Sequence, residues 1–241
     1  MIQVEGIFTG GGVTSAPIMG TDFTWTGGDN ICMVLDDGGG NWRIKFLSSG
    51  IFTPLKNMVI DVFLVGAGGG LYRNYDNKVY RFGGGGGYTK TVRSIVLAAN
   101  TEYPIVIGAG GVGGRSTTTS GAGTAGGYSS AFGASVDGGD GARSNQGGNG
   151  GSGAGGRNPS YSATPGSDGS DASAVGSGRG GTGQGTTTRE FGESAGTLYS
   201  TGGSAEYSNG KDGDPNTGDG GDAAKSGSSG ICIVRQHKEA A

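Results

Sequence analysis

Tyrosine, arginine and asparagine side chains that could recognise a ligand lie in short polar segments between runs of glycine. An aromatic ring supplies contact area at low entropic cost, and neighbouring Asn and Arg groups supply hydrogen bonds. On this ground the predicted binding residues are Tyr72, Arg73, Tyr75, Arg157, Asn158, Tyr161, Tyr207 and Asn209. For residues 72–80 the alternative is a tyrosine-rich hairpin that packs on a sheet edge.

Residues for catalysis are sparse. Glu190 and Glu193 are the closest glutamate pair, and two carboxylates can flank a glycosidic bond, but a solvated turn is the simpler interpretation. The single histidine, His237, falls in the polar tail, so a serine or cysteine nucleophile has no evident positioned base. We therefore expect a protein that is not an enzyme and that needs no cofactor.

Metal binding is also disfavoured by the residue inventory. One histidine and two cysteines far apart in the chain cannot form a cysteine–histidine metal site. Asp212, Asp214 and Asn216 have the spacing of ligand positions 1, 3 and 5 of a calcium loop. Position 6 is Thr217 where such a loop has glycine, and position 12 is Ala223 where it has glutamate. A solvated acidic turn is the favoured interpretation, and no metal is expected.

The segments that must position these side chains are dominated by glycine. All but 11 of the 59 glycines in this 241-residue chain lie between Gly66 and Gly230. Glycine offers no apolar side chain and loses much backbone entropy on ordering, so this region must stay disordered or pack backbone against backbone. A flexible glycine–serine linker is the alternative that composition alone favours.

The spacing of the glycines favours packing. Gly138, Gly141, Gly147, Gly150, Gly153 and Gly156 share one period-three frame, and a left-handed helix of the polyproline II type has three residues per turn. Such a helix presents bare backbone along one edge. The apolar run 231–234 must also return to a sheet, which brings the ends of the glycine region together. We expect a bundle of polyglycine helices with polar turns at its ends, and these six glycines to be structural.

Runs rich in aromatic and β-branched residues predict an all-β framework with essentially no α-helix. The predicted strands are 21–26, 31–35, 42–47, 58–65, 88–97, 103–107 and 231–235, and a five-residue loop suggests that 88–97 and 103–107 form a hairpin. The expected organisation is a β-rich attachment region over 1–57, a glycine-rich domain over 58–235 and a polar tail over 236–241. Within that domain, strands 58–65, 88–97, 103–108 and 231–235 enclose a bundle over 108–230.

Charge and hydropathy exclude several partners. The formal net charge is −3 and basic residues are scattered, which disfavours nucleic acid. No apolar run reaches the roughly 18 residues of a membrane span, and residues 1–5 lack the features of a secretory signal. Cys32 and Cys232 are predicted to be buried free thiols, with a disulfide as the alternative.

The sequence resembles the glycine-rich modules of phage and prophage tail proteins, and a related arrangement occurs in the glycine-rich domain of anaplastic lymphoma kinase receptors. The segments that carry the resemblance are Val62–Gly70, Gly83–Gly87, Tyr103–Gly111 and Gly230–Arg235, with Gly39–Leu47 and Thr187–Glu193 phage-like in particular. The resemblance implies a small β-sandwich, of jelly-roll or TNF-like type, from which a bundle of polyglycine II helices projects.

What the resemblance implies about function is a tail-fibre or tail-tip adhesin. Its loops would bind a bacterial surface receptor, either a glycan or an outer protein, and its β-rich part would attach to other tail or fibre subunits. The protein would be part of a virion assembled in the host cytoplasm, with no membrane insertion and with a homo-oligomer as an option. The alternative is a structural spacer or decoration protein whose loops contact other virion subunits.

Overall fold

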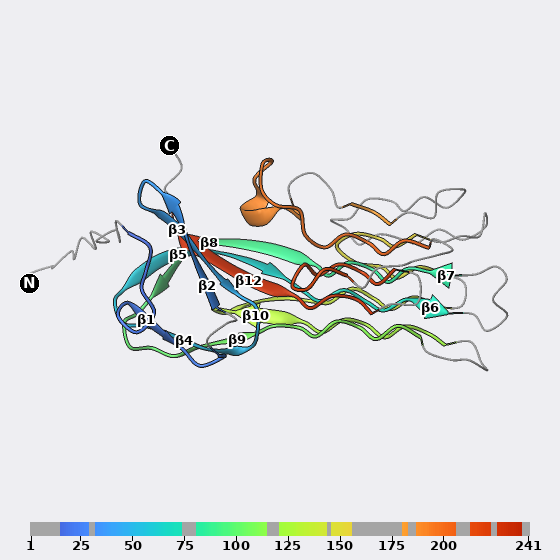
Figure 1. Ribbon diagram of the computed structural model, residues 1–241, viewed down its shortest axis with the longest axis horizontal. Helices are drawn as coiled ribbons and strands as arrows, with labels where there is room; N and C mark the ends of the chain where they lie inside the picture. Colours follow the sequence, from blue (N-terminus) through green and yellow to red (C-terminus); the bar gives the residue numbers. More distant parts are fainter. Residues whose placement is uncertain are drawn as a thin grey trace, which may run out of the picture.

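The protein is elongated, with a β-sandwich at one end and a bundle of glycine runs extending from it (Figure 1). The computed structural model describes residues 15–28, 32–73, 81–114, 121–143, 146–155, 180–182, 187–205, 213–222 and 226–237. All strand pairs among the described elements are antiparallel, and the helical content is a single short 3₁₀ turn, η1 (Glu190–Gly192). The predicted all-β class is therefore confirmed.

Two five-stranded sheets form the sandwich in the described part of the chain. The first has the order β1 (Phe23–Trp25), β4 (Gly50–Pro54), β9 (Tyr103–Val106), β10 (Ser129–Ala131) and β11 (Ala134–Val136). The second has the order β2 (Cys32–Gly38), β3 (Asn41–Phe46), β12 (Ile231–Gln236), β5 (Met58–Val65) and β8 (Thr89–Leu97). A small third sheet joins β6 (Tyr72–Arg73) and β7 (Arg81–Phe82) at the far end of the bundle (Figure 1).

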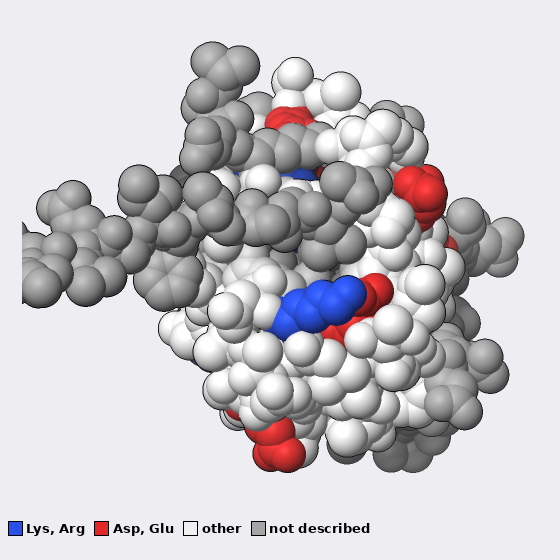
Figure 2. All heavy atoms as spheres, turned by 90° about the vertical axis from the view of Figure 1, so that its left-hand side faces the viewer, with Lys and Arg blue, Asp and Glu red and all other residues white. Residues whose placement is uncertain are grey.

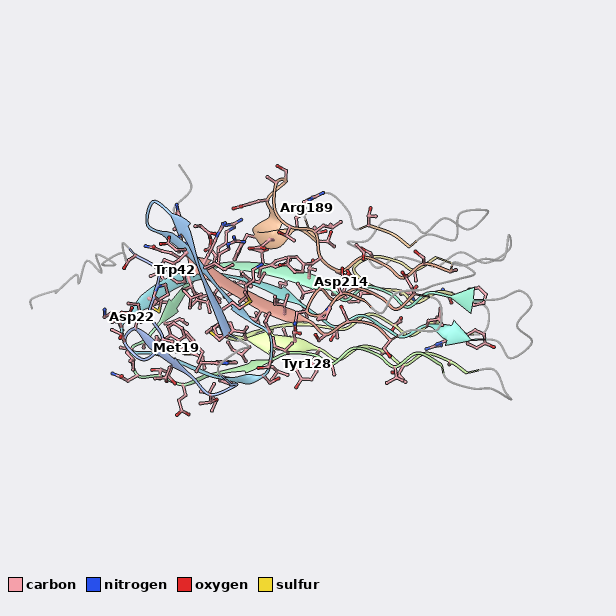
Figure 3. All side chains as sticks on the ribbon, viewed as in Figure 1. Met19, Asp22, Trp42, Tyr128, Arg189 and Asp214 are labelled. Atoms are coloured by element: carbon pink, nitrogen blue, oxygen red, sulfur yellow. The ribbon has the colours of Figure 1, made fainter. Side chains whose placement is uncertain are left out.

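Side-chain alternation along the strands places the main core between the two sheets. In β5, Met58, Ile60, Val62 and Leu64 point inward and are buried, as the period of two in a strand requires. Aromatic rings from both sheets interlock, with the rings of Phe46 and Phe52 5.5 Å apart in an edge-on arrangement. The core is built from the conventional apolar residues of the chain, and Figure 3 shows most of the side chains gathered in the sandwich.

Both cysteines contribute to this core as free thiols. Cys32 in β2 and Cys232 in β12 lie opposite Phe46 on its two sides, so a whole strand separates them. Two strand spacings amount to roughly 9.5 Å, which exceeds the Cα separation that a disulfide tolerates. Burial raises the pKa of the Cys32 thiol to about 11 and raises that of Cys232 as well, so both stay protonated at neutral pH.

Three details of the sequence-based organisation differ from the structure. The predicted hairpin of 88–97 with 103–107 is wrong: β8 pairs with β5, whereas β9 pairs with β4 and β10 in the other sheet. Leu97 and Ile105 thereby enter the shared core from opposite sides. Residues 23–54 supply strands to both sheets, so they are integral to the sandwich. Residues 129–136 return from the glycine region to add β10 and β11.

The outer face of the second sheet is covered by residues 187–200. Outward-pointing Phe63, Val65, Ile231 and Ile233 contact Phe191 and Tyr199 of this segment. The rings of Phe63 and Tyr199 are 5.5 Å apart, and those of Phe63 and Phe191 are 6.1 Å apart. This second apolar cluster explains why alternate residues of β5 and β12 are buried on both faces.

The glycine bundle consists of the runs 66–70, 83–87, 108–114, 121–127, 137–142, 147–155, 180–182, 201–205, 218–222 and 226–230, which lie side by side (Figure 1). Hydrogen bonds from one run to a given neighbour recur every three residues. The amides of Gly66 and Gly69 donate to the run 83–88, and those of Ala67 and Gly70 donate to the run 121–127. The amide of Gly68 donates to Ser228 of a third run.

The run 83–87, which continues directly into β8, occupies the centre of the bundle. Its amides donate to the runs 152–155, 137–140 and 218–221, each neighbour being met at an interval of three residues. Its carbonyls accept from the runs 66–69 and 148–151 and from Gly203. Backbone groups thus take the place of apolar side chains in this second core.

Glycine is required where these runs approach each other. A Cβ added at Gly85 would lie 2.0 Å from the Asn149 carbonyl oxygen, and one added at Gly69 would lie 2.1 Å from that of Asp140. Real Cβ atoms essentially never come within 3.0 Å of another group. At the predicted structural positions Gly138, Gly141 and Gly150, the corresponding distances are 2.2, 2.2 and 1.9 Å. Gly147 and Gly153 are buried, and Gly156 lies outside the described residues.

Candidate functional site

The far end of the bundle brings together several interruptions between glycine runs. β6 and β7 lie at this end (Figure 1). Gly83, next to β7, donates to the Gly155 carbonyl at 3.1 Å, and Gly155 donates to Gly203 at 2.9 Å. Three described stretches therefore end near one another at this end of the molecule, at residues 73, 155 and 205. These ends precede the three polar segments that carry the predicted binding residues.

Most of the predicted binding residues cannot be placed. Tyr72 and Arg73 form β6, but Tyr75, Arg157, Asn158, Tyr161, Tyr207 and Asn209 lie outside the described residues. Tyr72 is only 6% exposed, and its ring packs against that of Phe82 at 6.1 Å and next to Ala142. Tyr72 thus occupies a small apolar cluster in a hairpin, as in the alternative interpretation of this segment, and its ring is not available to a ligand.

The acidic turn near residue 214 is held by ordinary hydrogen bonds. The Asn216 side-chain oxygen accepts from the Ser229 hydroxyl at 3.0 Å, and an Asp219 oxygen accepts from the Thr201 amide at 2.8 Å. Asp214 is exposed, and Asp212 lies outside the described residues. The described residues hold no group of three or more His, Cys, Asp or Glu side chains arranged to bind a metal.

A second candidate region is the charged face, which we define as Asp37, Arg43, Lys45, Asp61, Arg93, Glu190, Glu193, Arg235 and His237. The strand residues of this set project from the outer face of the second sheet, and the two glutamates come from the covering segment 187–200. A cavity of about 470 Å³ lies between the segment and the sheet, and its walls include Trp42, Arg43, Glu193 and Arg235.

Glu190 is buried and paired, which corrects the interpretation of residue 190 as part of a solvated turn, whereas Glu193 is exposed as that interpretation expects. The Glu190 side chain is 4% exposed, and it accepts a hydrogen bond from Arg43 at 2.6 Å and from the Tyr199 hydroxyl at 3.3 Å. Burial, reinforced by the Glu190 carboxylate, raises the pKa of Tyr199 well above its ordinary value. Tyr199 therefore stays protonated and donates.

Glu193 anchors the other end of the covering segment. It binds Arg235 at 2.5 Å, and the Arg235 guanidinium also lies 4.2 Å from the centre of the Phe191 ring. Both glutamates are thus engaged by arginine. The same arginine contacts fix the segment 187–200 on the sheet.

Asp61 is the buried centre of the charged face. One carboxylate oxygen accepts from the Ser94 amide at 3.2 Å and contacts His237 Nδ1 at 2.6 Å; the other accepts from Arg93 at 3.2 Å and from Arg235 at 3.3 Å. Burial alone would raise the pKa of Asp61, but the hydrogen bonds from His237, Ser94 and Arg235 outweigh it and hold this pKa below its usual value. Asp61 is therefore ionised at neutral pH.

Sequence reasoning missed this centre, although a signal was present. Asp61 is the one charged residue in the apolar run 58–65, and a buried carboxylate requires partners. His237 is not part of a free tail: its amide donates to the Val59 carbonyl at 2.9 Å, which extends the pairing of β12 with β5 and brings the ring to Asp61. The contact of His237 with Asp61 could be predicted only from the antiparallel register of β5 and β12, which are distant in sequence.

Comparison with known protein families gives a match that includes the glycine-rich part of the chain. A family model described as a glycine-rich domain matches residues 47–237, which is well over half of the chain. No curated protein matches the sequence. In the described residues, no helix is long and apolar enough to cross a membrane. The match begins just before β4 and ends at the histidine beside Asp61, and the chain belongs to this family of glycine-rich domains.

Proposed function

We propose that this chain is a tail-fibre or tail-tip adhesin of a phage or prophage, in which the sandwich, of jelly-roll or TNF-like type, carries a rigid bundle of polyglycine II helices. The polar segments at the far end of the bundle bind a receptor on the bacterial surface. The sandwich end attaches to other tail subunits. The observation that carries the proposal is the backbone core around the run 83–87.

The polyglycine II assignment rests on the period of the hydrogen bonds. A helix with three residues per turn presents every third amide to the same neighbour, and the donors Gly83 and Gly86, Gly84 and Gly87, and Gly85 and Tyr88 follow this rule. A β-strand would alternate with a period of two. The fit of glycine alone at these positions supports the same assignment.

A backbone core suits a protein that must present loops far from its attachment point. The bundle needs no large side chains, so its length can grow without a larger apolar core, and its hydrogen bonds resist bending. The polar segments inserted at residues 74–80, 156–179 and 206–212 can vary without disturbing the runs beside them, as loops on a rigid scaffold do. Each of these segments carries Tyr and Asn, side chains that suit contact with a glycan or a protein surface.

The surface of the sandwich end, opposite the polar segments, is mainly uncharged and includes exposed apolar side chains. Figure 2 shows that the sandwich end carries isolated charged side chains on a mainly uncharged surface. Ile18 and Met19, at 62% and 42% exposure, lie in the segment that leads into β1, beside the Lys56–Asp22 ion pair. Exposed apolar side chains at the end remote from the polar segments support attachment to another subunit there.

The proposal is tested by adsorption to host cells. The double variant Tyr161→Ala with Tyr207→Ala should bind cells at least tenfold more weakly while melting at the same temperature, because it removes two aromatic side chains from the polar segments and leaves the glycine runs intact. Tyr128→Ala is the matched control, since Tyr128 is 55% exposed on the side of the bundle (Figure 3).

Equal adsorption by the double variant and the control would contradict receptor binding by these segments. If the chain failed to bind cells but bound purified virion subunits, and the double variant lost that binding, a structural spacer or decoration role would replace the adhesin role.

A further inference from the structure

We propose that Ser94, His237 and Asp61 form a nucleophilic site that cleaves carboxylic esters. The site lies on the outer face of the second sheet, beside the covering segment 187–200, and goes beyond the proposed binding role of the bundle. It contradicts the expectation, drawn from the sequence, that no base is positioned near a serine.

The three side chains form a continuous hydrogen-bond chain. Ser94 Oγ lies 2.8 Å from His237 Nε2, and His237 Nδ1 lies 2.6 Å from Asp61 Oδ1. Because Asp61 is ionised it can only accept, so Nδ1 carries the ring proton and Nε2 holds the free electron pair. The Ser94 hydroxyl therefore donates to Nε2, which is the arrangement of a serine nucleophile with its general base and orienting carboxylate.

The local backbone aims Ser94 at the histidine. The register of β5 with β8 shifts between Ile60 and Val62, so Arg93 and Ser94 together oppose Asp61 in a β-bulge. Ser94 has φ of +57°, a left-handed conformation that costs a non-glycine residue about 1 kcal/mol or more. The Ser94 amide bonded to Asp61 stabilises this conformation. Bulges and residues in strained conformations are concentrated at functional sites.

The burial pattern also fits the three roles. Asp61 is completely buried, the His237 side chain is 20% exposed, and Ser94 is exposed. The nucleophile can thus be reached from solvent while the carboxylate is shielded. Arg93 beside it is exposed as well.

In the reaction, Ser94 Oγ forms a bond to the ester carbonyl carbon while its proton passes to His237 Nε2. The resulting tetrahedral oxyanion collapses, the carbon–oxygen bond to the alcohol breaks, and the alcohol leaves with the proton from Nε2. Water then attacks the acyl-Ser94 ester, passes a proton to Nε2, and releases the carboxylic acid as Ser94 regains its hydrogen. The products are one alcohol and one acid, and no other reactant is consumed.

The surrounding cations make the reaction slow. Arg93 and Arg235 bind the other oxygen of Asp61, and only Arg235 has a further carboxylate partner, Glu193, among the contacts described here. Two cations next to the carboxylate weaken its stabilisation of a positively charged imidazole. Both acylation and deacylation pass a proton to His237, so we expect both steps to be slow and a reactive probe of Ser94 to be the more sensitive assay.

The test is covalent labelling of the full chain with a fluorophosphonate probe, followed by peptide mass spectrometry. Ser94 should be labelled faster than the other serines of the chain. His237→Gln should lower the rate at which Ser94 is labelled at least tenfold. Hydrolysis of p-nitrophenyl acetate should fall to the uncatalysed rate in Ser94→Gly.

Ser94→Gly is chosen because glycine accepts the positive φ, so the variant keeps its fold. Ser135→Ala, which removes an exposed serine from β11, is the matched control and should be labelled at Ser94 like the native chain. Absence of Ser94 labelling in the folded protein, or labelling that His237→Gln leaves unchanged, would overturn the proposal. Neither result bears on adsorption to cells.

Discussion

Single glycines in the bundle are expected to matter for stability as much as large core side chains do in other proteins. Gly85→Ala places a methyl group 2.0 Å from the Asn149 carbonyl oxygen, in a position enclosed by backbone that cannot rotate away. We expect the free energy of unfolding to fall by more than about 4 kcal/mol, in the range reserved for severe core damage. Chemical denaturation followed by circular dichroism measures this loss.

Gly133→Ala serves as the control for this substitution. Gly133 has φ of +76° but open space around its Cα, so alanine there should cost only about 1 kcal/mol. Equal losses at positions 85 and 133 would show that lost glycine flexibility, rather than close backbone packing, sets the stability.

Asp61 makes stability depend on pH in a defined direction. Its pKa is lowered in the folded protein, so the stabilisation is complete above the unfolded value of about 4 and is lost as pH falls through the folded value. Asp61→Asn should cost roughly 3 kcal/mol at pH 7, because Arg93 and buried Arg235 lose a charged partner. It should also flatten the acid limb of stability against pH.

Urea denaturation at a series of pH values measures both effects. Glu102→Gln, at an exposed position before β9, should change stability by less than about 0.5 kcal/mol. An acid limb as steep in Asp61→Asn as in the native chain would assign the acid sensitivity to other carboxylates, of which Asp22, with its pKa lowered by the hydrogen bond from Lys56, is the first candidate.

The covering segment 187–200 contains the short 3₁₀ turn η1 and is held on the sheet by a few anchor residues. Phe191 is 2% exposed and packs on Phe63 and under Arg235, so Phe191→Ala should cost about 3 kcal/mol and free the segment locally. Trypsin should then cleave after Arg189 much faster than in the native protein. Leu198→Ala, at a partly exposed position of the same segment, should leave cleavage slow.

Strands were the most predictable elements, because their residues have a high intrinsic preference for the β conformation. The runs 42–47, 58–65 and 231–235 are rich in β-branched and aromatic residues and coincide closely with β3, β5 and β12. The short strands β10 and β11, with the sequences SSA and ASV, carry no such preference; β10 forms by pairing with β9, and β11 by pairing with β10. Pairing partners were less predictable, since the loop 98–102 has a hairpin's length yet crosses between sheets.

The candidate functional residues also fall into two groups, those that composition alone indicates and those that only strand pairing brings together. Tyr and Arg in polar segments are recognisable by composition, whereas the contact of His237 with Asp61 and Ser94 depends on strand register across more than 140 residues. A lone histidine near a chain end offers no local signal of such a partner. Likewise, the burial of Tyr72 follows from its neighbour Phe82, which is across a hairpin.

At the scale of the whole molecule, the sandwich and the bundle share their central chain segments. β5 continues into the run 66–70, the run 83–87 continues into β8, and the run 226–230 continues into β12. Three neighbouring strands of the second sheet, β12, β5 and β8, are therefore extended by runs of the bundle. Unfolding either part would leave the other with exposed apolar or unpaired backbone groups, so one cooperative transition is expected.

Hydrogen exchange measures this coupling directly. The amides of Gly69, Gly85 and Gly86 donate to carbonyls at 2.8 to 3.0 Å inside the bundle, and they should exchange as slowly as those of β5, with the free energy of global unfolding. Gly133, in an exposed turn, should exchange within the fastest class. Fast exchange at Gly69 and Gly85 beside slow exchange in β5 would mean that the glycine runs form a flexible appendage, and a rigid presentation of the polar segments would then be untenable.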